Sequence, residues 1–265
     1  MKNITRKTTV LILIMLFTIS MFKSNVFAQK KFEGYWESVT NSKSTMPMAP
    51  KKTNEKQKSF YKPGKIKIIN LTKNKTTILR FDKGLMWEID DNNKTYSEMT
   101  FDQMQMEMKN AKTKMAEAMK EMDPEQREMM KKMMGGKMGA MFGDSETPMI
   151  SFKNTGKKKT IKGYNCTQFL MYLGKDPMME MWLTKKYNLG DDFIKIYQKM
   201  GLMKGKMPKN SKLNGFPILM KTKVDLGMGK MEEETIVTKI VKTGVSDKEF
   251  ELPKGYKKIE NQMAF

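Results

Sequence analysis

The chain has no histidine, and its 265 residues include a single cysteine, Cys166. Without histidine, the commonest general base, the Ser-His and Cys-His dyads and the usual zinc sites are excluded. A single cysteine cannot form an internal disulfide, so the core alone must hold the fold. Cys166 is therefore predicted to be a buried structural thiol. We predict no catalytic residue and no cofactor, and an enzyme is the least supported class of protein.

Two other patterns also lack the context that chemistry requires. The pairs Asp90/Asp91 and Asp191/Asp192 stand where turns and helix starts favour aspartate. The stretch Gly227-Met228-Gly229 lacks the strand-to-helix setting of a phosphate-binding loop. Neither pattern changes the prediction of a non-enzymatic protein.

The N-terminus has the three parts of a secretory signal peptide. The basic residues Lys2, Arg6 and Lys7 precede an apolar run over about 9–22, and small residues end at Ala28. The run is shorter than the ~20 residues that span a bilayer comfortably. The sequence thus predicts cleavage after residue 28 and leaves 29–265 as one exported domain, either periplasmic or secreted.

Positive charge is in excess, with 50 Lys and Arg against 29 Asp and Glu. Because residues 1–28 carry four basic residues and no acid, the mature chain has a formal net charge of 21 − 4 = +17. Between Lys30 and Lys83 there are fourteen basic residues and four acids. This asymmetry favours anionic partners such as lipid headgroups and peripheral contact with a membrane surface, and export argues against nucleic acid. A solvated lysine-rich surface is the alternative.

Short strands separated by turns account for most of the chain. Residues 32–40 and the segments GKIKIINL, KTTILRFD, GLMWEID and KTYSEMT read as strands, with hairpin turns at 82–84 and 90–93. Alternation resumes in KTIKGYNCTQFLMYLG, MMEMWLTK, GFPILMKTKVDLG and EEETIVTKIVKTG. The polar, lysine-rich residues 41–62 are predicted to be a flexible segment. The expected fold class is α+β, with a curved antiparallel sheet of about eight to ten strands and two or three helices.

At Thr100 the hydrophobic period changes from two to about 3.6. Thr100 and Gln103 form a capping-box pattern, and Asp123 with Pro124 gives a second helix start. A methionine-rich helical hairpin over about 101–142, inserted into the sheet and covering one of its faces, is therefore predicted, and a shorter helix is predicted over 190–200. One helical stripe carries Met108, Ala111, Met115, Ala118 and Met122.

Methionine outnumbers leucine by 31 to 15, and residues 103–141 contain no leucine, isoleucine or valine. Three explanations stay open. The methionines fill a helix–sheet interface, or they form a lid that adapts to acyl chains at ~0.8 kcal/mol per buried methylene. Alternatively, their thioethers bind Cu(I) or Ag(I). The third explanation depends on the M-x-M elements at 46–48, 104–108 and 179–181, and residues two apart on a helix point to different sides.

Five segments follow one another along the chain: ILRFDKGLMWEIDDNNKTYSEMTF, the insert with DPEQREMMKKMM, IKGYNCTQF, EMWLTK and FELPKGYKK. Together they resemble a bacterial envelope family catalogued as domain of unknown function 4412, over roughly 65–258. That family looks like a relative of the lipoprotein-carrier superfamily of the LolA and LolB type. The resemblance implies a half-open barrel that wraps a helical lid over an apolar cavity, and it implies no catalytic residue.

The leading hypothesis is a non-enzymatic envelope protein that binds a hydrophobic or anionic, lipid-like amphiphile. A Met-thioether Cu(I) or Ag(I) protein is the first alternative. A structural or assembly module with a protein partner is the second. The candidate ligand-binding residues are Trp87, Phe101, Met108, Met115, Met122 and Trp182.

Overall fold

The computed structural model describes residues 31–47, 49–133, 150–173, 176–189, 215–225 and 229–260. The predicted signal peptide and the helix predicted over 190–200 lie outside these ranges. Residues from Lys31 onward form one compact unit. No helix within the described ranges is long and apolar enough to cross a membrane.

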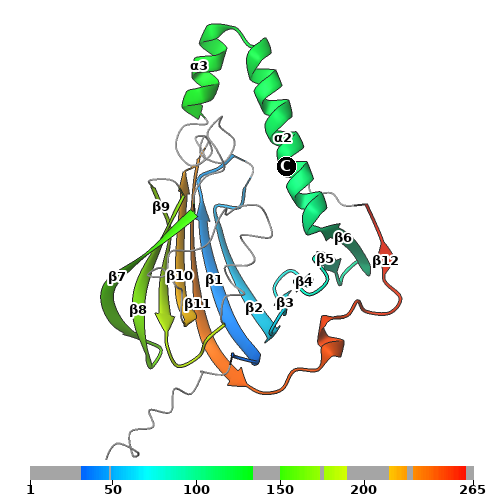
Figure 1. Ribbon diagram of the computed structural model, residues 1–265, viewed down its shortest axis with the longest axis vertical. Helices are drawn as coiled ribbons and strands as arrows, with labels where there is room; N and C mark the ends of the chain where they lie inside the picture. The colour runs from blue at the N-terminus through cyan, green and yellow to red at the C-terminus, as the bar shows by residue number, and fades with distance from the viewer. Residues whose placement is uncertain are drawn as a thin grey trace, which may run out of the picture. The chain divides into compact units, whose positions relative to one another are not determined.

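One open, curved sheet of 12 strands organises the described residues (Figure 1). The strand order is β12-β6-β5-β4-β3-β2-β1-β11-β10-β9-β8-β7, and neighbours are antiparallel except β12 and β6, which are parallel. The predicted curved antiparallel sheet is confirmed, with more strands than expected. The strands are β1 (Gly34–Ser44), β2 (Lys52–Lys62), β3 (Lys65–Asn70), β4 (Lys75–Arg80), β5 (Leu85–Asp90), β6 (Thr95–Thr100), β7 (Ile150–Ile161), β8 (Tyr164–Leu173), β9 (Asp176–Thr184), β10 (Phe216–Asp225), β11 (Lys230–Lys242) and β12 (Lys257–Lys258).

Residues 41–62 are not the flexible segment that the sequence predicts. β1 continues to Ser44 and pairs with β2 from Lys52 onward. Across this pair the hydroxyls of Ser42 and Thr53 share a hydrogen bond of 2.6 Å. The prediction is wrong because polar composition does not exclude a strand when exposed and half-buried residues alternate, as they do along β2.

The predicted meander of β3 to β6 is confirmed, and its turns follow local chemistry. Gly84, at φ 66°, takes the left-handed position in the turn after β4. In the turn after β5, Asp90 Oδ1 accepts hydrogen bonds from the backbone N–H groups of Asn92 and Asn93 at 3.0 and 3.2 Å. These donors, that of Asn93 first, lower the pKa of the Asp90 carboxyl below its ordinary value. The two turns therefore fix the register of β4, β5 and β6.

Two helices, α2 (Phe101–Glu121) and α3 (Pro124–Met133), lie where the sequence predicts the insert. The capping box is present, because Thr100 Oγ1 accepts from the Gln103 N–H at 3.1 Å and Gln103 Oε1 accepts from the Thr100 N–H at 2.9 Å. Asp123 Oδ1 accepts from a backbone N–H in the first turn of α3 at 2.8 Å. Within the sheet, α2 makes its main contact with β6. Cover of a whole face by the helices stays a prediction.

Arg127 of α3 closes the C-terminal end of α2. Its guanidinium donates to the carbonyls of Met119 at 2.9 Å, Lys120 at 3.1 Å and Met122 at 3.0 Å, and the end of a helix leaves such carbonyls without partners. We expect Arg127→Leu to weaken the last turns of α2 by about 1 kcal/mol, seen as faster amide hydrogen exchange over 115–121. Arg127→Lys keeps the charge but not the planar fork and should exchange at an intermediate rate. Unchanged exchange in Arg127→Leu would contradict this role.

Alternation along the strands gives the sheet two faces. On the C-terminal face, named for the segment that packs on it, the buried cluster is Ile78, Trp87, Ile89, Val245 and Phe250. On the α2 face, the buried cluster is Phe81, Met86, Met99, Phe101 and Met104. A third cluster, with members on β2 and on β7 to β11, includes Phe32, Phe216 and Ile218.

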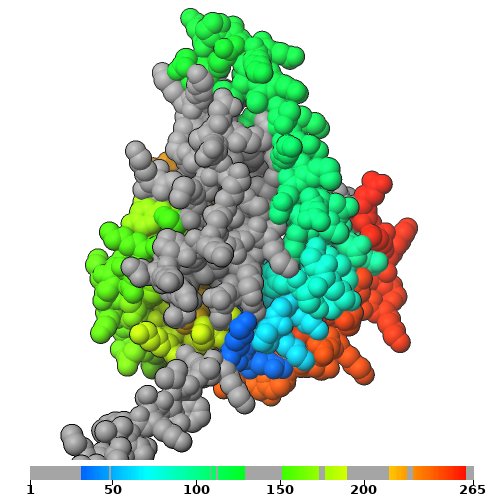
Figure 2. All heavy atoms as spheres, in the orientation of Figure 1, coloured from blue at the N-terminus to red at the C-terminus, as the bar shows by residue number. Residues whose placement is uncertain are grey.

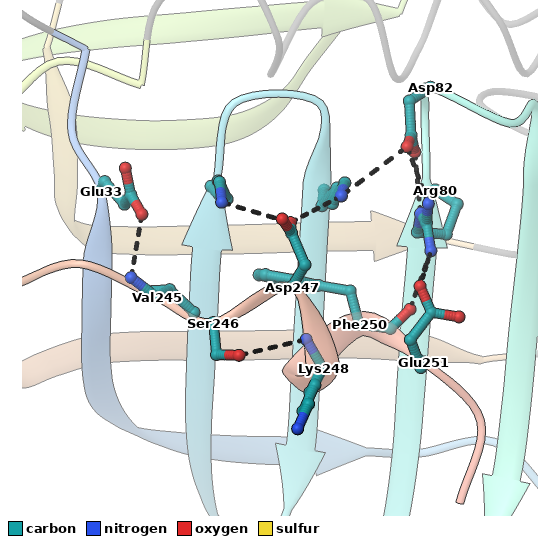
Figure 3. Close-up of polar contacts among 11 residues, drawn as sticks. Glu33, Arg80, Asp82, Val245, Ser246, Asp247, Lys248, Phe250 and Glu251 are labelled. Atoms are coloured by element: carbon teal, nitrogen blue, oxygen red, sulfur yellow. Dashed lines mark hydrogen bonds and ion pairs between the residues drawn. The ribbon is translucent and has the colours of Figure 1, made fainter.

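The segment 243–256 is fastened to the C-terminal face by Arg80 of β4 (Figure 3). Arg80 is 3% exposed, and its Nε and Nη2 donate to the Asp82 carboxylate at 2.8 Å each. Its Nη1 donates to the Phe250 carbonyl at 3.1 Å and to the Glu251 carboxylate at 2.9 Å. The buried guanidinium of Arg80 thus joins β4 to Phe250, which lies 170 positions further along the chain.

Candidate ligand-binding face

The register of β3 to β6 sets three successive rows of side chains on the α2 face. Residues opposite each other on neighbouring strands lie side by side, and residues two apart along a strand share a face. The rows are Ile66, Leu79, Met86 and Met99, then Ile68, Thr77, Glu88 and Ser97, then Asn70, Lys75, Asp90 and Thr95. Along the strands the α2 face therefore changes from apolar, through mixed, to polar and charged.

The apolar row is closed by the start of α2. Met104 is 3% exposed and belongs to one buried cluster with Met86 and Met99. Phe101 and Phe81, in the same cluster, stack with ring centroids 5.9 Å apart. Sulfur–aromatic contacts are favourable, and methionine fills irregular gaps. This packing anchors the methionine stripe of α2 at the apolar end of the α2 face.

A hollow of about 560 Å³ lies over the mixed and charged rows. Ile259 and Glu260, which follow β12, also line it. Small-molecule sites usually enclose roughly 300–1,000 Å³, but most of their lining is apolar. The polar lining therefore suits the polar part of an amphiphile whose apolar part lies on the neighbouring row. Six lining residues point to the α2 face by alternation: Lys75, Thr77, Glu88, Asp90, Thr95 and Ser97. Three further strand residues of the lining, Thr76, Ile89 and Tyr96, alternate to the C-terminal face.

The hollow has more negative than positive groups. Lys75 is its one ammonium among the lining residues, against the carboxylates of Glu88, Asp90 and Glu260. Asp90 is ionised at neutral pH as an ordinary aspartate is, and its hydrogen bonds lower the pKa of its carboxyl further. This balance favours a ligand group that carries an ammonium over one that is only anionic.

The two tryptophans predicted to bind ligand lie away from the hollow. Trp87 is in the cluster of the C-terminal face, where its indole N–H donates to Glu98 at 2.7 Å. Trp182 lies on β9 in the third cluster, and its indole N–H donates to Glu180. The structure therefore brings neither tryptophan to the α2 face of β4 to β6.

The other predicted ligand-binding residues lie in or after α2. Phe101 is in the apolar cluster with Met86 and Met99. Met115 and Met122 are half-buried, and the side chain of Met108 lies outside the described part of the chain. Of the six predicted residues, the structure thus places only Phe101 directly beside the apolar row, among the residues it describes.

Sequence reasoning missed the strand residues of the three rows. The signal was present, because the turns at 82–84 and 90–93 define the pairing of β4, β5 and β6. Once the pairing is fixed, Met86 must lie opposite Met99, and Glu88 opposite Ser97. Selecting residues by type, aromatic or methionine, missed this pattern.

The methionine pairs differ in geometry. Met104 is 3% exposed and Met106 is 58% exposed, so the two lie on different sides of α2 as expected. Met179 and Met181 share one face of β9 because they are two apart on a strand. Met48 lies outside the described residues. Within those residues no group of three His, Cys, Asp or Glu side chains could hold a metal, and soft-metal binding by thioethers stays an untested prediction.

The remaining reactive groups have structural partners. Cys166 is buried, as predicted, and burial raises the pKa of its thiol to about 11, so it is protonated at neutral pH. The Asp91 carboxylate accepts from Thr76 Oγ1 and from Tyr256 Oη at 2.9 Å each. These bonds tie β4, the turn after β5 and the C-terminal segment together. Asp191, Asp192 and residues 227–228 lie outside the described ranges.

A family model described as Domain of unknown function (DUF4412) matches residues 101–256. None of the curated proteins matches the chain. An uncharacterized conserved protein from Thermus thermophilus is similar in structure at a TM-score of 0.43, with 6% identity over 86% of this chain and 91% of that one. A LolA superfamily protein from Nitrosomonas europaea gives a TM-score of 0.32, with 7% identity over 83% and 92%. The lipoprotein LppX of Mycobacterium tuberculosis gives 0.25, with 10% identity over 78% and 87%.

Proposed function

The chain belongs to the DUF4412 family, and from this membership and the graded α2 face we propose that it is a non-enzymatic, exported envelope protein that binds a lipid-like amphiphile. The family description names no reaction. The proposal therefore depends on what the α2 face can hold.

The observation that carries the proposal is the change of polarity along β4 to β6. The buried side chains of Met86 and Met99 lie beside the hollow, which begins at Thr77, Glu88 and Ser97. An acyl chain and its headgroup have the same sequence of polarities. We place the apolar part against the methionine cluster and the stripe of α2, where each buried methylene contributes ~0.8 kcal/mol. The headgroup then occupies the hollow.

The charges of the hollow indicate which class of lipid headgroup it would bind. Three carboxylates and Lys75 suit a zwitterion, whose ammonium faces Glu88 and whose phosphate faces Lys75. An ethanolamine headgroup has this composition. The ligand is thus a zwitterionic lipid rather than a purely anionic one.

The first test is native mass spectrometry of the protein purified without detergent from its own envelope. We expect a bound species of lipid mass that disappears after organic extraction, and fragmentation of the extract should give a phosphoethanolamine headgroup. A bare polypeptide mass in both samples would contradict the proposal. In that case Cu(I) titration under reducing conditions and capture of a protein partner would address the two alternative functions.

A further inference from the structure

The β7–β8 hairpin has lysine but no acid. Between Glu146 and Asp176 the sequence contains six lysines and no aspartate or glutamate. The described part of this stretch contains five of these lysines, and all five have exposed side chains: Lys153, Lys157, Lys158, Lys159 and Lys162. No other run of this length combines so many exposed lysines with no acid within the described residues.

The hairpin occupies an edge of the sheet. β7 is the last strand in the order, and it pairs with β8 on one side (Figure 1). In the space-filling view the green to yellow-green spheres of β7 and β8 form an outer margin of the molecule (Figure 2). Because side chains alternate, Lys158 and Lys159 point to opposite faces, so the lysines surround the edge. A planar surface that meets this edge would contact lysines from both faces.

Several lysines elsewhere in the described sheet have acidic partners. Lys65 pairs with Asp247 at 2.7 Å, and Lys221 with Glu234 at 2.8 Å. Part of the lysine-rich segment 30–83, from which the sequence predicts attraction to lipid headgroups, is similarly engaged. Further pairs in it join Lys62 to Asp247, Lys67 to Glu249 and Lys73 to Glu55. No such pair joins the five hairpin lysines to an acid within the described residues, so their charge is uncompensated.

Two tyrosines lie at the turn end of the hairpin. The rings of Tyr164 and Tyr187 are 6.3 Å apart, and Lys186 Nζ lies 5.4 Å from the centroid of Tyr164. Both rings are half-buried, and burial is the first cause that raises the pKa of Tyr164 above its ordinary value. Tyrosine is enriched where an apolar phase meets water, because its ring is apolar and its hydroxyl is polar.

We propose that the β7–β8 edge docks the protein on a bilayer that contains anionic phospholipid. The lysines contact headgroup phosphates, and Tyr164 with Tyr187 lies at the headgroup level. This surface lies on strands other than those of the hollow and does not depend on what the hollow binds. Edge lysines also prevent strand-to-strand aggregation, which is the competing explanation for their presence.

The test is cosedimentation of the purified protein with vesicles of phosphatidylcholine, with and without phosphatidylglycerol. The edge variant replaces Lys157, Lys158, Lys159 and Lys162 with glutamine. A matched control removes the same charge from exposed lysines elsewhere, at Lys83, Lys94, Lys248 and Lys254. Surface lysines act roughly independently on an anionic membrane, so the edge variant should bind phosphatidylglycerol vesicles at least about ten-fold more weakly. The control should stay within about two-fold of the unaltered protein, and binding should fall as salt is added.

Each other result would overturn the proposal. Equal loss in the two variants would mean that net charge alone attracts the protein. Unchanged vesicle binding with self-association of the edge variant would assign the lysines to edge protection. If the unaltered protein did not bind the vesicles, the β7–β8 edge would not be a membrane-docking surface. A variant with the hollow filled should still cosediment, which separates this proposal from the proposed function.

Discussion

Replacing Arg80 with leucine is expected to lower the free energy of unfolding by about 2 kcal/mol, because hydrogen bonds to charged groups contribute about that much and the carboxylates left behind are partly exposed to water. The guanidinium side chain is 4% exposed, and its loss leaves the Phe250 carbonyl without that donor and Asp82 with only the longer pair to Lys65 at 3.9 Å. Leucine keeps most of the apolar contact of the arginine stem, so the effect reports the polar contacts. Urea denaturation followed by tryptophan fluorescence would measure it, since Trp87 lies in the cluster that the fastened segment covers.

The same variant should respond differently to acid. The hydrogen bond from Arg80 is the first cause that lowers the pKa of Asp82 below 3.8. A carboxyl with a lowered folded pKa stabilises the fold above its unfolded pKa, and this contribution is lost as pH falls through the folded value. The difference between the unaltered protein and Arg80→Leu should therefore be complete near neutral pH and should shrink below about pH 3.8.

Arg127→Leu is the matched control, because it removes the other arginine of the described chain. Arg127 bonds within the helical insert and not to the sheet, so global unfolding should change by less than about 1 kcal/mol. A similar loss in both variants, or a loss below about 1 kcal/mol for Arg80→Leu, would show that Arg80 is not what holds the segment 243–256 on the sheet.

The meander and the helix starts could be predicted because their signals are local, and the buried thiol because the chain has no histidine to pair with it. The turn residues between β4, β5 and β6 and the capping box at Thr100 and Gln103 each act within a few positions of the chain. Period-two patterns predicted β1 and β7 to β11, and the period-3.6 pattern predicted α2. Each of these signals involves neighbours in sequence, which a single chain displays directly.

Long-range pairing explains what could not be predicted. β12 joins β6 as a parallel strand of two residues, too short for any periodic pattern. Arg80 meets Glu251 across 171 positions, and no rule of spacing brings them together. β2 carries its signal in half-buried polar residues whose cross-strand partners on β1 become evident only after the pairing is known. The hollow is a consequence of such pairing, since Ile259 reaches it by bonding to the Tyr96 carbonyl at 2.8 Å.

Filling the hollow is expected to abolish most ligand binding while leaving the fold intact. Thr77 of β4 is half-buried and lines the hollow, so a tryptophan there would enter the space assigned to the headgroup. We expect Thr77→Trp to bind a fluorescent phosphatidylethanolamine at least about ten-fold more weakly, a change of about 1.4 kcal/mol. Tryptophan is favourable in strands, and the hollow is open, so the free energy of unfolding should change little.

The control places the same residue on a strand away from the hollow. Thr238 of β11 is exposed, and Thr238→Trp should bind within about two-fold of the unaltered protein.

Glu88→Gln tests the charge argument separately, because it removes one carboxylate that faces the ammonium and should reduce the preference for phosphatidylethanolamine over phosphatidylglycerol. Equal binding by folded Thr77→Trp would place the ligand elsewhere. If the unaltered protein preferred phosphatidylglycerol, the proposal of an amphiphilic ligand would stand and the proposal of a zwitterionic headgroup would be wrong. The two proposals are separable because the methionine cluster contacts the acyl chain and the carboxylates contact the headgroup.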